Sequence, residues 1–139
     1  MNDVAQALSQ QSALLWLWRG MVWASAAYLF VLGALALIRP RVVERFFDGF
    51  ASTLRLNLLE AALRLLVGLA FMAVSPGTKL PLLVFGFGAV LAASALPMAL
   101  LFKAHKRLAA WAVPFAKRMM PLLGFSALVA GAAIVWALG

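Results

Sequence analysis

Three polar residues lie on one face of a long hydrophobic segment: Asn57, Glu60 and Arg64. Glu60 precedes Arg64 by one helical turn, which is the favourable order for an ion pair along a helix. Counted from Leu54 at about 1.5 Å per residue, Arg64 lies about 15 Å along the helix, near the middle of a bilayer. Insertion scales assign a cost of about 2.5–3.5 kcal/mol to an ionisable residue at that depth. These three residues are therefore the candidate polar intramembrane site.

Two interpretations of this site remain open. In the functional interpretation, it is an ion- or proton-coupled site or a polar contact with a substrate headgroup. In the structural interpretation, it is a clamp that fixes helix packing. The small residues Ala61 and Gly68 give the segment a surface for close packing, which suits the clamp. A later start of the helix would instead place Glu60 at the membrane surface. Side chains that point into a cavity would favour transport, and side chains sealed in a dry helix contact would favour the structural role.

Other chemistry has little support in the sequence. The single histidine, His105, is surrounded by Lys103, Lys106 and Arg107, whose charge opposes metal binding, so we expect it to be solvated or to face headgroups. The chain has no cysteine, which excludes disulfides and thiolate chemistry. One intramembrane carboxylate without a second disfavours paired acid–base catalysis. We predict no catalytic residue, no cofactor and no metal, and hence no enzyme.

The composition is typical of a membrane protein. Of 139 residues, 66% are hydrophobic and 12% are charged, whereas soluble domains carry about 45–50% apolar and about 25% charged residues. A water-soluble fold of this size could not hide so much apolar surface, so lipid must cover it. We expect residues 1–139 to form a single integral membrane domain.

Four stretches are long enough to cross a bilayer as helices. They cover residues of about 20–38, 54–74, 80–102 and 121–138, and a span needs about 20 residues. The runs are continuous rather than alternating, which favours helices over barrel strands. The predicted fold is all-α and polytopic, with four transmembrane helices.

The two long connections, of about 40–52 and 104–118, are predicted to be amphipathic helices in the plane of the membrane interface. In the first, Val43 and Phe47 share a face opposite the charged residues. Each half of the chain thus has the order span, basic break, interfacial helix, span, and laying Arg39 on Lys103 suggests a parallel two-fold internal repeat. The alternative is that any four-span protein with two such connections looks alike.

Positive charge is concentrated in these connections. The chain has 12 Lys and Arg against 4 Asp and Glu, and Arg55 and eight further basic residues lie in or beside the connections. We expect those eight to contact anionic lipid headgroups: Arg39, Arg41, Arg45, Lys103, Lys106, Arg107, Lys117 and Arg118. Only Arg19 and Lys79 lie on the opposite side. The positive-inside rule then places both connections in the cytoplasm and both termini outside.

The sequence therefore predicts a multi-pass protein of a cell membrane, with the bacterial inner membrane as the expected location. The expected partners are membrane lipids, with anionic headgroups on the cytoplasmic side, and either further copies of the chain or a partner membrane protein, but no nucleic acid. The leading functional hypothesis is a small non-enzymatic membrane protein that packs with itself or with a larger membrane complex. The alternative is a small transporter or lipid-handling protein that uses Glu60 and Arg64.

Overall fold

The computed structural model describes residues 2–49 and 52–139. Within these residues the chain is all helical, with six α-helices and one turn of 3-10 helix. The elements, in chain order, are α1 (Asn2–Ile38), α2 (Pro40–Asp48), α3 (Leu54–Val74), η1 (Ser75–Gly77), α4 (Pro81–Leu100), α5 (Phe102–Arg118) and α6 (Met120–Leu138).

Helices α1, α3, α4 and α6 are long and apolar enough to cross a membrane. Prolines begin several elements, because a missing N–H costs nothing in the first turn of a helix: Pro40 opens α2, Pro81 opens α4 and Pro121 lies in the first turn of α6. Thr53 caps α3, since its hydroxyl oxygen accepts a hydrogen bond from the Leu56 amide. The four apolar helices indicate a multi-pass membrane protein.

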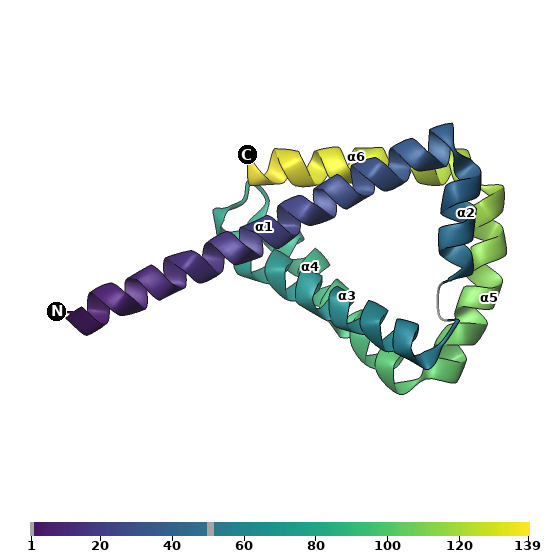
Figure 1. Cartoon of the computed structure of the whole chain (residues 1–139). Coiled ribbons are helices and arrows are strands. Elements are labelled where there is room, and N and C mark those ends of the chain that lie inside the picture. Colours follow the sequence, from purple (N-terminus) through teal and green to yellow (C-terminus); the bar gives the residue numbers. More distant parts are fainter. Residues whose placement is uncertain (1, 50–51) are drawn as a thin grey trace.

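The long helices form two pairs, α1 with α6 and α3 with α4. The pairs meet at one end, where Val22, Phe71, Val74 and Leu138 form a buried cluster. The Lys79 amide there donates a hydrogen bond of 2.9 Å to the Ala137 carbonyl, which ties the α3–α4 turn to the end of α6. From this apex the pairs diverge, and α2 and α5 lie across their far ends, so that the helices outline a triangle (Figure 1).

The base of the triangle holds a second apolar cluster. Val43 and Phe47 of α2 pack with Ala36 of α1 and Met120 of α6, and Val113 and Ala116 of α5 lie against them. Lys117 of α5 forms an ion pair with Asp48 of α2. The two connections that are far apart in the sequence therefore lie side by side.

Small residues allow the backbones within each pair to approach closely. A Cβ atom added at Gly68 of α3 would lie 2.6 Å from the Ala92 amide nitrogen of α4, and one added at Gly33 of α1 would lie 2.8 Å from the Gly124 carbonyl oxygen of α6. Real Cβ atoms do not approach other atoms so closely, so glycine is required at both crossings. Packing of small residues is the usual basis of helix association in membranes.

The helices differ from the predicted stretches at two boundaries. The predicted span of about 20–38 lies within α1, which extends back to Asn2 because residues 2–19 contain neither proline nor glycine. The helix α5 begins at Phe102, so the third span ends at Leu100 rather than at residue 102. The predicted connection of about 40–52 is helical over Pro40–Asp48, and its residues 50 and 51 lie outside the described part of the chain.

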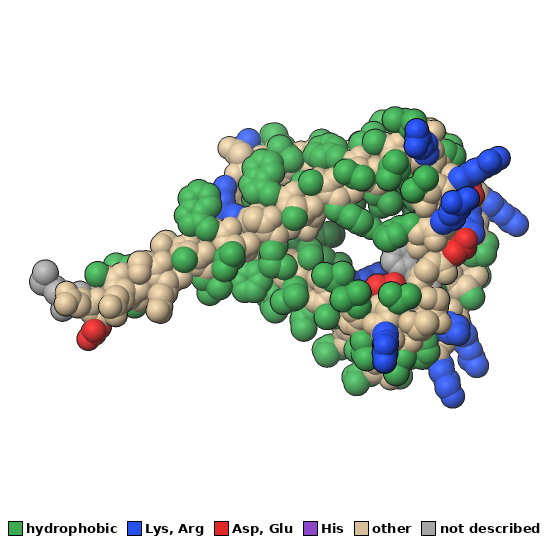
Figure 2. All heavy atoms as spheres, in the orientation of Figure 1, with side chains coloured by type: hydrophobic (Ala, Val, Ile, Leu, Met, Phe, Trp, Pro, Cys, Tyr) green, Lys and Arg blue, Asp and Glu red, His purple; other side chains and the backbone are tan. Residues whose placement is uncertain are grey.

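Lys and Arg side chains gather at the end of the molecule that carries α2 and α5 (Figure 2). The apex carries Lys79, whose ammonium lies 4.9 Å from the centre of the Trp136 ring. The charge asymmetry that the sequence contains is therefore also an asymmetry in space between the two ends of the triangle.

Candidate functional site

Asn57 lies sealed in the contact between α3 and α4. It is 0% exposed, and its side-chain nitrogen donates a hydrogen bond of 2.7 Å to the main-chain carbonyl of Met98. That carbonyl is in the last turn of α4, where helix carbonyls lack partners within the helix. Asn57 therefore caps the end of α4. Its Oδ1 atom is buried and accepts no hydrogen bond from the described residues.

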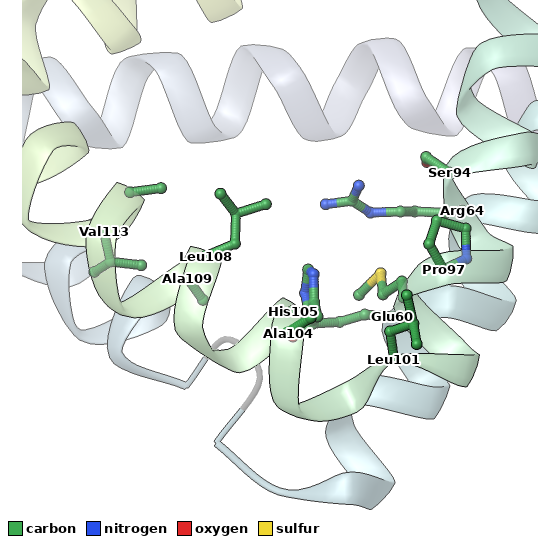
Figure 3. Close-up of a pocket in the computed structure, with 12 residues that line it drawn as sticks. Glu60, Arg64, Ser94, Pro97, Leu101, Ala104, His105, Leu108, Ala109 and Val113 are labelled. Atoms are coloured by element: carbon green, nitrogen blue, oxygen red, sulfur yellow. The ribbon is translucent and has the colours of Figure 1, made fainter.

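Glu60 and Arg64 lie instead on the wall of a cavity of about 480 Å³ between α3, α4 and α5. Both side chains come from α3, and Ser94 comes from α4 (Figure 3). The remainder of the wall is mainly apolar and is formed by Pro97, Met98, Leu101, Ala104, Leu108, Ala109, Ala112 and Val113, together with His105. The cavity thus has a few polar groups on a largely hydrocarbon surface, which is the usual character of a small-molecule site.

The carboxylate of Glu60 faces His105 of α5. The Oε2 atom of Glu60 lies 4.0 Å from the Nε2 atom of His105, and the two side chains are 20% and 17% exposed. That separation is too long for a hydrogen bond. The same Oε2 atom is buried and has no hydrogen-bond donor among the described residues. A buried acceptor without a donor costs about 1–3 kcal/mol, more if it is charged.

The expected ion pair between Glu60 and Arg64 is not formed among the described residues, which is a correction to the prediction from spacing. The acidic group is turned toward α5, whereas the guanidinium of Arg64 extends into the cavity beside Leu108 (Figure 3). Helical spacing places two side chains on one face but leaves their rotamers free. The position of α5 at the corner brings His105, rather than Arg64, to Glu60.

His105 is the site residue that sequence reasoning missed. Its basic neighbours suggested a solvated or headgroup-facing residue, yet it lines the cavity. The reason is the break at Leu101, after which α5 changes direction and brings His105 to 4.0 Å from Glu60 of α3. The signal was present in the helical spacing of Leu101, His105, Leu108 and Ala112, which places His105 on an otherwise apolar face.

A smaller hollow of about 160 Å³ lies in the corresponding corner between α1 and α2. Its wall is almost wholly apolar and includes Val31, Leu35, Val42 and Phe46. Tyr28 supplies its only hydroxyl, and the Tyr28 ring meets the Phe46 ring edge to face, with centroids 6.4 Å apart. One corner of the triangle therefore offers polar groups and the other offers hydrocarbon.

The basic residues predicted to contact anionic lipid are divided between the two connections and their edges. Most of them are exposed: Arg39, Arg41, Arg45, Lys103, Lys106, Arg107 and Arg118. Lys117 is partly buried and is engaged by Asp48. Lys106 lies 5.9 Å from the centre of the Phe102 ring. None of these eight residues lines the cavity that holds Glu60 and Arg64.

Comparison with known protein families, with curated proteins and with solved structures finds no match for this chain. The class that the fold and the site define is an all-helical, multi-pass membrane protein with a polar-edged cavity between three of its helices.

Proposed function

We propose that this protein binds a membrane lipid in the cavity between α3, α4 and α5, and that it handles that lipid without chemical conversion. The observation that carries the proposal is the placement of Glu60, Arg64 and His105 on a wall that is otherwise mainly apolar. A lipid has the same division, with a polar headgroup joined to apolar chains. The costly charge of Arg64 inside a span is then explained by a ligand rather than by packing alone.

Blocking the cavity tests the proposal. Ala109 lines the cavity, and its neighbour Ala110 is exposed and does not. The full chain, purified in a mild detergent, is expected to retain lipid that native mass spectrometry detects. Ala109→Trp should remove the bound lipid, and Ala110→Trp, the matched control, should keep it. Equal lipid retention by the wild type and both variants would show that the lipid binds elsewhere and would refute the proposal.

We further propose an orientation, with α2 and α5 as interfacial helices on the cytoplasmic side and both termini outside. The gathering of Lys and Arg at one end supports it. The exposed rings of Trp111 and Phe115 on α5, stacked with centroids 6.5 Å apart, suit the headgroup level. In this orientation the cavity lies toward the cytoplasmic leaflet, and the surrounding basic residues attract anionic headgroups. The proposed location is a cell membrane such as the bacterial inner membrane.

A parallel two-fold repeat, in which α1–α3 and α4–α6 are equivalent, is also proposed. Such a repeat matches α1 with α4 and α3 with α6. The pair α1–α6 is then equivalent to the pair α4–α3, and both pairs are observed, which supports the repeat. The two hollows correspond in the same way, one at the α1–α2 corner and one at the α4–α5 corner. Related sequences whose halves fail to align in this register would contradict the repeat.

A second candidate function is packing with a partner membrane protein or with further copies of the chain. The helix α1 has 37 residues, about 56 Å at 1.5 Å per residue, whereas a bilayer core is about 30 Å thick. Residues 2–17 are all exposed, and Val4, Leu8 and Leu15 lie along one side of this extension. Deleting residues 2–17 should release the partner or lower the oligomeric state, and an unchanged native complex would argue against this role.

A further inference from the structure

We propose that the ligand of the cavity is a phospholipid whose headgroup carries a primary ammonium beside its phosphate. The inference rests on the proposed function and specifies the chemistry of the bound headgroup. Glu60 would accept hydrogen bonds from the ammonium, and Arg64 would bind the phosphate.

The ammonium is indicated by the unsatisfied oxygen of Glu60. Its Oε2 atom is buried and receives no hydrogen bond from any described residue, and the Glu60 side chain as a whole is 20% exposed and lines the cavity. His105 Nε2, at 4.0 Å, is too distant to donate. A primary ammonium offers three N–H donors, whereas a quaternary ammonium offers none. The carboxylate thus lacks a cationic partner within hydrogen-bond distance among the described residues, and a primary ammonium at its cavity side would combine donors with the complementary charge.

The phosphate is indicated by Arg64. Its guanidinium is permanently cationic, with five N–H donors in a fork that suits phosphate oxygens. In the described part of the chain, no carboxylate lies within ion-pair distance of it. Glu60 and Arg64 lie one helical turn apart on α3 and both line the cavity, so one headgroup can contact both side chains.

The order of the two groups fits a lipid of the leaflet on the basic side. Glu60 lies nearer the basic end of α3, and Arg64 lies one turn deeper. A phospholipid in that leaflet also presents its ammonium nearest the surface, then its phosphate, then its chains. The apolar hollow at Tyr28, Val31 and Phe46 would supply a hydrocarbon surface for an acyl chain. Figure 2 shows the molecule hollowed between α1 and α3, where such a chain would lie.

The charge balance of the cavity argues against an anionic headgroup. Its wall carries one carboxylate, one guanidinium and one histidine. An anionic headgroup without an ammonium would satisfy Arg64 but would leave Glu60 next to another negative group. A zwitterionic headgroup gives each of the two charges its complement. The basic residues that suit anionic lipid lie outside the cavity.

The first test compares headgroups on the unmodified full chain. The protein in nanodiscs is titrated with phosphatidylethanolamine, its N-methylated derivatives, phosphatidylcholine and phosphatidylglycerol, all with the same acyl chains. Occupancy is read by native mass spectrometry. We expect binding to weaken with each added methyl group and to be about tenfold weaker for choline than for ethanolamine, because hydrogen bonds to a charged group are lost. Equal binding of ethanolamine and choline lipids, or tighter binding of phosphatidylglycerol, would overturn the inference.

The second test assigns the two halves of the headgroup. Glu60→Leu, which removes the acceptor, should abolish the preference for ethanolamine over choline, whereas Arg64→Leu should weaken both lipids to a similar extent. The matched controls are Glu44→Leu on α2 and Arg55→Leu on α3, which lie outside the cavity and should leave the preference and the affinity unchanged. A preference that survives Glu60→Leu would show that another group binds the ammonium and would refute the assignment.

The outcomes separate the headgroup inference from the proposed function. In one outcome, the wild type retains lipid that Ala109→Trp loses and yet shows no headgroup preference. That outcome would refute only the inference of a primary ammonium headgroup. Retention that Ala109→Trp leaves unchanged would refute the lipid-binding cavity itself. Competition by soluble glycerophosphoethanolamine at the same concentration as the lipid would place the ligand in solution and would overturn its assignment to the membrane.

Discussion

The side-chain amide of Asn57 and the main-chain carbonyl of Met98 join α3 to the last turn of α4 through a hydrogen bond of 2.7 Å. The carbonyl has no amide of its own helix to pair with, because α4 ends at Leu100 and α5 begins anew at Phe102. The same bond holds the corner from which α5 turns back toward Glu60. Asn57 thus has a structural role beside a cavity that its neighbours line.

Replacing Asn57 with leucine should destabilise the protein by about 1–2 kcal/mol, because the Met98 carbonyl is then buried without a donor. The measurement is reversible unfolding in mixed micelles. Leu58→Ala is the control, since Leu58 is on the same helix and exposed. A stability for Asn57→Leu that equals that of the wild type would mean that the capping bond contributes nothing measurable.

A matched pair of glycines on α4 tests the close contact between α3 and α4. A Cβ atom added at Gly88 would lie 2.6 Å from the Gly68 carbonyl oxygen, whereas one added at Gly86 would meet nothing within 4 Å. Gly88→Ala should therefore separate the helices and cost about 1–3 kcal/mol through overpacking. Gly86→Ala should be neutral or slightly stabilising, since alanine is the better helix former. Equal unfolding free energies for the two variants would contradict the observed contact.

The orientation can be tested directly because the chain contains no cysteine. Thr78→Cys places a thiol at the apex, and Ser52→Cys places one at the basic end. With intact cells, a membrane-impermeant maleimide should label Thr78→Cys, whereas Ser52→Cys should react only after permeabilisation. The reverse pattern would place the basic connections outside and would contradict the positive-inside assignment.

The number of long helices and their approximate ends could be predicted from the sequence, because hydrophobic length and proline breaks depend on local physics. A connection as short as residues 75–79 requires the two helices that it joins to be antiparallel neighbours, and α3 and α4 do pack together. The start of α1 could not be placed from hydrophobicity, because a helix continues through polar residues such as Gln10 and Gln11 as long as nothing breaks it.

The site was predicted only in part, and the reason is tertiary. Helical periodicity placed Asn57, Glu60 and Arg64 on one face, but it could not show that Asn57 is sealed against α4 while the other two line a cavity. Asn57 is level with the last turn of α4 and bonds to it, whereas the side chain of Arg64 extends into the cavity. His105 could be found only once the turn between α4 and α5, which brings it to 4.0 Å from Glu60, was known.

The last prediction concerns the partner of Glu60. The contact of 4.0 Å with His105 needs a shift of about 1 Å to become a hydrogen bond, whereas no ion pair with Arg64 is formed among the described residues. In a double-mutant cycle on unfolding free energy, Glu60→Gln and His105→Gln should therefore be coupled by about 0.5–1 kcal/mol, as expected for a partly exposed pair. In the same assay, Glu60→Gln and Arg64→Leu should be additive to within about 0.3 kcal/mol.

Both cycles are measured in lipid-free detergent, because a bound zwitterionic headgroup would itself link Glu60 to Arg64. Adding phosphatidylethanolamine should then create coupling between Glu60 and Arg64 that is absent without it. Strong coupling of Glu60 to Arg64 in lipid-free detergent would mean that the two residues pair directly, and the cavity would then lose the free acceptor and the free cation on which its headgroup chemistry depends.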